Sequence, residues 1–309
     1  MVERDVFSVS CSPRRSPARR LARSPVGKRV EVFGLSDDES DHLAQDNLDD
    51  AWCPGGLDLS VSEESHLHIE EAVGAYGFAR WCIRRLVATS MIATLAQACK
   101  ARGHRIRVGS LCSGFDVGVL AVRALTVAYN SYVADSGGEQ MRVEHAFSCE
   151  YDDAKRAVLH KIYPDCARLF KDIAQVATGQ AHDEVSGCMV DVPSCDLLLA
   201  GPSCKDCSSL NNQPKALDDD SGSSCLTLTR TIKYIKDKLP KVVILENVKG
   251  FMTYRECLGA SAVDWVLAEL APYGYVGQAS QVNSLDFALP QCRRRVYLTL
   301  ALSDWHRRR

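Results

Sequence analysis

Two short apolar runs restrict the fold of this chain more than any other feature. They are DLLLA at Asp196–Ala200 and VVILENV at Val242–Val248, and an amphipathic stretch, Leu226–Leu239, separates them. Apolar runs without polar alternation predict strands that are buried on both faces, and such strands occur in parallel sheets covered by helices on each side. The sequence therefore predicts an α/β fold with a doubly wound, mostly parallel sheet.

The rest of the chain divides into a tail and one folded domain. Residues 1–65 hold a basic run with Ser-Pro repeats and then an acidic run, with too little apolar content to form a core, so we expect a disordered tail. Residues 66–309 form the folded domain, with a helical lead-in at 66–103 and a core at 104–309. The core strands are expected at 105–112, 143–150, 196–200, 242–248, 275–283 and 295–302, and the core helices at 117–130, 152–163, 226–239 and 261–274.

Composition excludes several classes of protein. The net charge is −2, with 46% apolar and 25% charged residues, so any nucleic-acid binding must come from local patches. No apolar run reaches the length of a membrane span and no signal peptide opens the chain, so we expect no membrane partner. The fourteen cysteines are scattered, which indicates reduced thiols in the nucleus or cytosol. Only Cys204 and Cys207 form a CxxC pair, and no second pair stands at zinc spacing, so no metal site is expected.

Polar residues gather where the predicted strands end. In open α/β sheets, ligands bind beyond the carboxyl ends of the strands. The residues at those ends are Ser113–Asp116, Glu150, Gly201–Cys207 and Glu246–Asn247. Gly114 would let a ligand approach the backbone of the first turn, or it is simply a structural turn glycine. The turn is not G-x-G-x-x-G, so a dinucleotide is not indicated.

Two acids stand at positions suited to an adenosine-type ligand. An acid such as Glu150 at the end of the second strand commonly accepts hydrogen bonds from ribose hydroxyls. The alternative is a solvated strand-end carboxylate. Asp172 follows at the next strand end, where it would bind an adenine amino group or merely cap a helix.

A second group of residues is suited to chemistry on a substrate. Cys204, at the tip of a buried strand, predicts a nucleophile, although a structural cysteine and a redox pair with Cys207 are alternatives. Glu246 ends a buried strand, where an acid is costly unless it is hydrogen-bonded or functional. It would donate a proton or hydrogen bond to a heterocycle, or pin the Cys204 loop. Gln291, Arg293 and Arg295 alternate, which puts them on one side of the backbone. The arginines would stabilise a thiolate and an anionic substrate, or form a basic edge.

Taken in chain order, these pieces resemble the cytosine-5 DNA methyltransferase family. The resemblance covers Val108–Leu302 and rests on the glycine turn, the two acids, GPSCKDCS, LENVKGF and PQCRRRVYL. It implies a Rossmann-like fold and a methyltransferase activity that uses S-adenosylmethionine as cofactor. It also implies that Cys204 adds to carbon 6 of a flipped cytosine, that Glu246 contacts the ring nitrogen and amine, and that carbon 5 takes the methyl group.

The resemblance also implies roles for the neighbouring residues. The catalytic residues would be Cys204, Glu246, Arg293 and Arg295, with Ser203, Asn247 and Gln291 supporting the substrate loop. The cofactor-binding residues would be Ser113, Gly114, Phe115, Asp116, Glu150, Tyr151, Asp172, Ile173, Gly201 and Pro202. The substrate would be DNA, with RNA such as transfer RNA as the alternative. A degenerate binding module and, last, a thiol oxidoreductase are the other hypotheses.

Three departures from the family pattern stand out. The family's Pro-Pro-Cys-Gln is Pro202-Ser203-Cys204-Lys205 here, so the second proline is missing. The first turn has Phe115-Asp116-Val117 where the family is richer in glycine. A target-recognition region is expected after the Q-x-R-x-R strand, so we expect a partner or a further C-terminal segment to supply it. The basic run at Ser10–Pro25 is either a nuclear import signal, a nucleic-acid-binding arm or a solvated tail, and we expect a nuclear location with the cytoplasm as the alternative.

Overall fold

The structure, a computed structural model, describes residues 77, 79–84, 103, 105–134, 139–203, 223–255, 259–287 and 291–303. The predicted tail at 1–65 and most of the predicted lead-in at 66–103 lie outside this part of the chain, and they remain predictions. Residues 79–84 are helical, and Ala79 and Ile83 pack against the helix that follows the first strand.

The described residues form a nine-stranded sheet in the order β10-β11-β7-β6-β1-β2-β3-β4-β5, beside a two-stranded sheet of β8 and β9. The strands of the large sheet are β1 (Arg105–Leu111), β2 (Arg142–Cys149), β3 (Leu169–Phe170), β4 (Gln180–Asp183), β5 (Cys188–Asp191), β6 (Leu197–Ala200), β7 (Val242–Asn247), β10 (Tyr275–Asn283) and β11 (Arg294–Leu302). The small sheet pairs β8 (Tyr254–Arg255) with β9 (Ala260–Ser261). The helices are α3 (Val117–Ala134), α4 (Asp153–Ile162), α5 (Ile173–Val176), α6 (Ser223–Lys238) and α7 (Ala262–Leu270). Short 3₁₀ turns lie at Lys249–Met252, Ala271–Tyr273 and Ser284–Phe287.

The centre of the sheet is parallel and its edges are antiparallel. β1 pairs in parallel with β2 on one side and with β6 on the other, and β6 pairs in parallel with β7. The chain order therefore reverses at β1, so the switch point lies between β1 and β6. Ligands of such sheets bind at this point, beyond the carboxyl ends of the strands.

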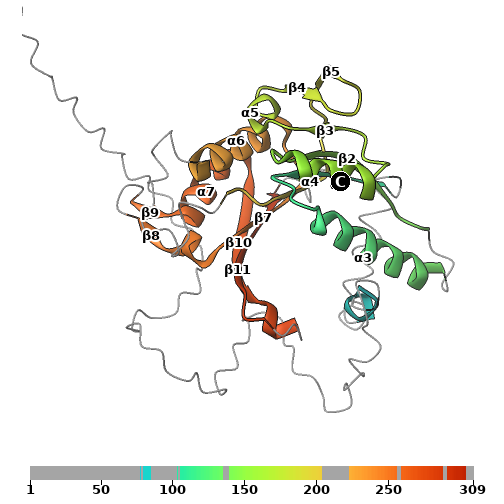
Figure 1. The fold of residues 1–309 in the computed structure, drawn as a ribbon. Coiled ribbons are helices and arrows are strands. Elements are labelled where there is room, and N and C mark those ends of the chain that lie inside the picture. The colour runs from blue at the N-terminus through green and yellow to red at the C-terminus, as the bar shows by residue number, and fades with distance from the viewer. Residues whose placement is uncertain are drawn as a thin grey trace, which may run out of the picture. The chain divides into compact units, whose positions relative to one another are not determined.

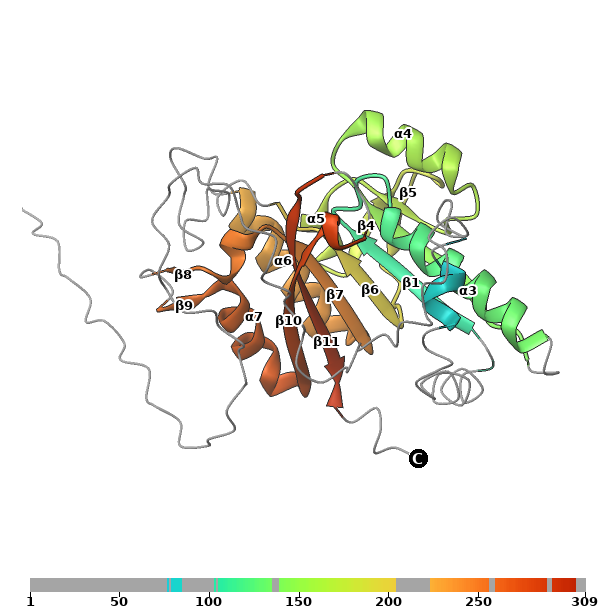
Figure 2. The same cartoon turned by 90° about the horizontal axis from the view of Figure 1, so that it is seen from below.

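Helices cover both faces of the central strands (Figures 1 and 2). On one face, Leu228 and Ile235 of α6 belong to the same buried cluster as Leu198 of β6. On the other face, Val119 of α3 and Leu159 of α4 pack with Val108 of β1. Two-sided burial explains the uninterrupted apolar runs of β6 and β7. The doubly wound, mostly parallel fold is confirmed.

The structure adds elements that the sequence pattern did not predict. The β4–β5 hairpin and the β8–β9 pair were missed because their strands are two to four residues long and show no apolar periodicity. α3 ends at Ala134, four residues beyond the predicted end. β2 carries one extra residue opposite β1, since Val108 faces His145 while the next residue, Gly109, faces Phe147.

The prediction about membrane spans needs a correction. By length and composition alone, α3 is apolar enough to cross a membrane. In the fold this helix is partly buried: Val119, Tyr129 and Val133 lie in the domain core, whereas Val117 and Val127 are exposed. The buried residues contact the sheet and the helical residues 79–84.

Candidate active site

The first strand ends in a turn that is tied to the neighbouring strand. After Leu111, the amide of Ser113 donates to the carbonyl of Cys149 at 3.0 Å, and the Ser113 Oγ accepts from the Cys149 amide at 3.1 Å. Gly114 follows with φ +57°, a conformation that favours glycine. Its amide donates to Glu150 Oε2 at 2.7 Å. The turn and the acid therefore form one unit at the switch point.

Glu150 is a buried carboxylate held by backbone amides. It is 8% exposed, and its other oxygen, Oε1, accepts from the Asp152 amide at 3.0 Å. Arg156 supports the same corner, because its Nη1 donates to the Glu150 carbonyl at 2.8 Å. Phe115 and Tyr151 flank the corner with rings that are 52% and 77% exposed. A fixed acid beside two exposed rings fits a ligand with ribose hydroxyls and an aromatic base.

Asp172 has a structural role in the fold. It is the N-cap of α5, where its Oδ1 accepts from the Ala174 amide at 2.7 Å. It lies two residues after the end of β3, at the next strand end, as predicted. The helix-cap alternative is present in the structure, and contact with an adenine stays a prediction, as does a role for Ile173 at the first position of the helix.

The loop after β6 is held from three elements. The Gly201 amide donates to the Leu111 carbonyl at 3.2 Å, and Asn247 Nδ2 donates to the Pro202 carbonyl at 3.3 Å. The Ser203 amide donates to Oγ1 of Thr227 in α6 at 3.0 Å. The next residue, Cys204, and its CxxC partner Cys207 lie outside the described residues.

Glu246 and Arg295 form an ion pair beside this loop, at the carboxyl end of β7. Arg295 Nε lies 2.9 Å from Glu246 Oε1, with side chains 22% and 39% exposed. The pair forms because β11 runs antiparallel to β7, with Tyr297 opposite Glu246. A methyl group placed on Gly201 would lie 3.6 Å from Glu246 Oε2 and 3.7 Å from the Cys112 carbonyl. The small residue Gly201 therefore lies between the Glu246 carboxylate and the Cys112–Asp116 turn.

Gln291 and Arg293 lie before β11 and are exposed. The Arg293 amide donates to Asn283 Oδ1 at 3.0 Å, and the Ser284 Oγ donates to the Gln291 carbonyl. These bonds fix the backbone at the start of the strand. Of the three alternating residues, all of which the structure describes, Arg295 is the one that forms an ion pair with Glu246. The roles of Gln291 and Arg293 stay predictions.

Asp116 points into the protein interior. Its side chain is 2% exposed, and Oδ2 accepts from the Ser148 hydroxyl. His145 Nε2 lies 2.8 Å from the same hydroxyl oxygen. Sequence reasoning missed Ser148, His145 and Thr227. The first two were detectable as polar residues within the apolar run of β2, where burial demands a partner.

Burial keeps several thiols protonated. It raises the pKa of Cys112 and of Cys195 to about 12 and that of Cys166 to about 11. The negative charge of Glu150 adds to the effect at Cys112. Because the thiolate is the reactive form, these three cysteines are poor nucleophiles.

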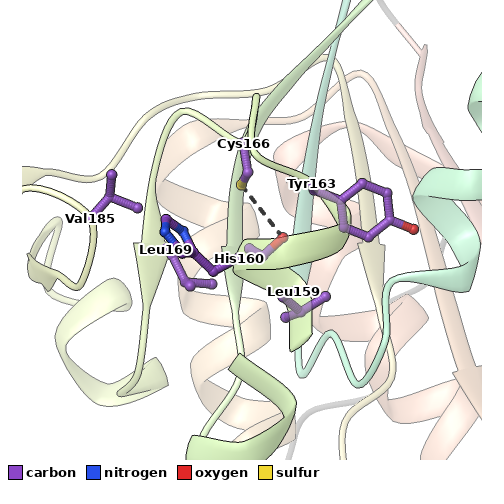
Figure 3. A pocket seen from close by; sticks show the side chains of 7 residues that line it. Leu159, His160, Tyr163, Cys166, Leu169 and Val185 are labelled. Atoms are coloured by element: carbon purple, nitrogen blue, oxygen red, sulfur yellow. Dashed lines mark hydrogen bonds between the residues drawn. The ribbon is translucent and has the colours of Figure 1, made fainter. Parts of the chain in front are cut away.

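A cavity beneath α4 is too small to bind a substrate. Its volume is about 10 Å³, and Figure 3 shows Cys166 and Tyr163 among the residues around it. Such a volume holds at most one water molecule. We expect the chemistry at the carboxyl ends of the central strands, where Glu150 and Glu246 lie.

Comparison with known families agrees with this geometry. The sequence profile of the C-5 cytosine-specific DNA methylases matches residues 133–308, more than half of the chain. The chain belongs to this family. The family resemblance, the Rossmann-like fold and the cytosine-5 methyltransferase class predicted from the sequence are thereby confirmed.

Several of the relatives that the chain matches are longer proteins. The DNA (cytosine-5-)-methyltransferase DMT5 of Cryptococcus neoformans is 32% identical over 197 residues, which cover 63% of this chain and 8% of that protein. The DMT5 of Verticillium dahliae is 28% identical over 256 residues, covering 66% and 10%. The type II methyltransferase M.HhaI of Haemophilus parahaemolyticus is 31% identical over 113 residues, covering 37% and 32%. The chain thus spans about a tenth of the length of the DMT5 relatives.

A solved structure of the S. pombe Dnmt2 methyltransferase aligns with 64% of this chain and 50% of its own, at 18% identity and a TM-score of 0.40.

Proposed function

We propose that this chain transfers a methyl group from S-adenosylmethionine to carbon 5 of cytosine in DNA through a covalent bond to Cys204. Family membership supports the reaction class. The observation that carries the proposal is the arrangement at one sheet edge: the Glu246–Arg295 pair, Gly201, and the turn whose amide binds Glu150. This arrangement would put a cytosine and a methyl donor next to each other.

On the donor side, the residues present fit S-adenosylmethionine. Glu150 would accept hydrogen bonds from the ribose hydroxyls, and the exposed rings of Phe115 and Tyr151 would flank the adenine. Asp172 would contact the adenine amino group. The remaining contacts would come from Ser113, Ile173 and Pro202 and from the backbones of Gly114, Asp116 and Gly201, because the Asp116 carboxylate is buried against Ser148. When bound, the cofactor supplies an electrophilic methyl group on its sulfonium.

On the substrate side, the thiolate of Cys204 would add to carbon 6 and push electron density onto carbon 5. Glu246 would contact the ring nitrogen and the exocyclic amine and so favour that addition, with Arg295 fixing its orientation. Carbon 5 would then form its bond to the methyl group as the bond between that methyl and the sulfonium sulfur breaks, which leaves S-adenosylhomocysteine as the neutral thioether. A base removes the carbon 5 proton, the carbon–sulfur bond breaks, and the thiolate is restored.

Support for the nucleophile comes from its surroundings. Gly201, Pro202 and Ser203 are anchored by Leu111, Asn247 and Thr227, so the backbone leading to residue 204 is fixed at three points. Asn247 makes the side-chain hydrogen bond to this loop, and its neighbour Glu246, held by Arg295, would meet the base. Arg293 would orient the loop from the other side, with Gln291 beside it.

The target cytosine must leave the base stack to reach this edge. We infer that a partner or a further segment supplies target recognition, which the family resemblance leads us to expect. We also propose a nuclear location, which the basic run at Ser10–Pro25 supports. A fusion to a fluorescent protein, with and without that run, tests the location.

The decisive experiment traps the adduct. A duplex with 5-fluorocytosine replaces the carbon 5 proton by fluorine, which the base cannot remove, so the enzyme stays bound to DNA after methyl transfer. We expect a denaturation-resistant adduct with S-adenosylmethionine, lost in Cys204→Ser and kept in the matched variant Cys207→Ser. Adduct loss in Cys207→Ser instead would refute the assignment of the nucleophile.

Two further arms separate the alternatives. A fluorinated single-stranded RNA or transfer RNA that traps the protein when DNA does not would move the substrate to RNA. Cofactor binding without any adduct would favour a binding module. Glu246→Gln should cripple turnover and leave cofactor binding intact, and turnover like that of the unmodified chain would refute the role of Glu246.

A further inference from the structure

The turn that follows β1 has an unusual backbone. Cys112, Gly114 and Asp116 have φ values of +53°, +57° and +53°. Glycine adopts this left-handed region readily and asparagine and aspartate tolerate it at a small cost, whereas a cysteine there is strained. Strain of this kind persists only where the surrounding structure over-determines the conformation. The contacts that hold the turn therefore identify what maintains its shape.

Successive residues at the end of β2 provide those contacts. The Ser148 hydroxyl donates to Asp116 Oδ2, and the backbone of Cys149 makes three hydrogen bonds with Ser113. Glu150 accepts from the Gly114 amide at 2.7 Å. Three neighbouring residues of one strand thus hold three positions of the turn, and Glu150 is both a support of the turn and the expected ligand of the ribose.

Asp116 is the buried anchor of this arrangement. Its carboxylate is 2% exposed and meets Ser148, while its carbonyl accepts from the Tyr163 hydroxyl at 2.9 Å. His145 lies behind Ser148 with Nε2 2.8 Å from the hydroxyl oxygen. A carboxylate in this position is turned away from any ligand at the sheet edge. Its influence on a ligand must act through the turn.

We propose that Asp116 and Ser148 are positioning residues for the methyl donor, which lock the strained turn so that the Gly114 amide and the Glu150 carboxylate stand ready at the cofactor edge. In the family pattern, glycines allow this turn to form because they adopt positive φ readily, and here the hydrogen-bonded pair of Asp116 and Ser148 takes that role. Here a residue with a side chain takes the left-handed conformation, and a buried hydrogen bond stabilises it. The assignment rests on the proposed function, since it takes the ligand of the turn to be S-adenosylmethionine.

Direct binding of S-adenosylmethionine to the full chain, measured by calorimetry, tests the proposal. Asp116→Ala and Ser148→Ala should raise the dissociation constant about tenfold or more. Asp116→Gly, which relieves the backbone strain but also lacks the anchor, should weaken binding as well. Asp116→Asn keeps an oxygen acceptor for Ser148 and tolerates positive φ, so its affinity should stay within about threefold.

Tyr234→Phe is the matched control for lost stability. Its hydroxyl is also buried and donates to the Pro193 carbonyl at 2.8 Å, but it packs on the other face of the sheet. This variant should lose stability with an unchanged dissociation constant. In turnover assays, the Asp116 and Ser148 variants should raise KM for the cofactor while kcat at saturation stays near that of the unmodified chain.

The results distinguish a failure of the positioning roles of Asp116 and Ser148 from a failure of the proposed function. Unchanged affinity in folded Asp116→Ala and Ser148→Ala would overturn this proposal alone. Equal weakening in Tyr234→Phe would do the same, because binding would then follow global stability. Failure of the unmodified chain to bind S-adenosylmethionine would refute the proposed function and this assignment together.

Discussion

Replacing Asp116 by asparagine should change how the stability of this protein depends on pH. Burial, with a contribution from the charge of Glu150, raises the pKa of Asp116 from 3.8 to about 6, although hydrogen bonds from Ser110 and Ser148 oppose the rise. A raised folded-state pKa stabilises the fold below pH 3.8, and this contribution is lost as pH rises through 6. One unit of pKa corresponds to about 1.4 kcal/mol, so the loss is about 3 kcal/mol.

His145 has the opposite dependence. Burial and the nearby guanidinium of Arg123 lower its pKa from 6.5 to about 4, against the charge of Asp165. Because Ser148 donates to Asp116, the Nε2 of His145 must carry the hydrogen that meets Ser148, and Nδ1 has no partner among the described residues. A depressed pKa gives stability above pH 6.5 that is lost as pH falls through 4, again about 3 kcal/mol.

In the unmodified protein the two contributions nearly cancel across the same pH window. Asp116→Asn removes the first and leaves the second unopposed. Its stability relative to the unmodified protein should therefore rise by about 3 kcal/mol between about pH 4 and pH 7. Over the same pH range, the stability of His145→Gln relative to the unmodified protein should fall by a similar amount. The stability of the double variant relative to the unmodified protein should again change little with pH.

Urea denaturation followed by circular dichroism at both pH values measures these differences. Titration of all other groups is common to the four proteins and drops out of the comparison. A gap between Asp116→Asn and the unmodified protein that is the same at both pH values would refute the reasoning. So would a double variant that keeps the slope of either single variant.

Three further predictions concern the site and the core. Thr227→Val removes the acceptor of the Ser203 amide, so adduct formation should slow about tenfold while cofactor affinity stays unchanged. Adding Ser203→Pro deletes that amide and should restore the rate. A double variant that does not recover would count against a role for this hydrogen bond. Arg295→Lys cannot keep the planar contact to Glu246 and should lower kcat about tenfold without changing the cofactor dissociation constant, whereas an unchanged kcat would remove Arg295 from the site. Gly109→Ala places a methyl group 2.4 Å from a phenyl carbon and should cost about 1–3 kcal/mol in urea denaturation, and a neutral result would mean that the ring can move aside.

Much of the fold followed from local patterns. The uninterrupted apolar run of β6 fixed a strand buried on both faces, and the position of Glu246 at the end of β7 placed an acid at the ligand edge. The short strands β3 to β5 were not predictable, because two to four residues do not establish a period.

The sequence by itself determined the chain order of the longer strands and helices, the family, and the polar residues at the strand ends. Only the tertiary structure decided which of those residues meet. Arg295 reaches Glu246 because β11 returns antiparallel beside β7, a pairing between segments about 50 positions apart in the chain. Strict alternation would put His145 and Ser148 on opposite faces of β2, and the extra residue in that strand brings both to Asp116. Apolar periodicity records only which face of a segment is buried, whereas register and bulges are set by contacts with remote parts of the chain.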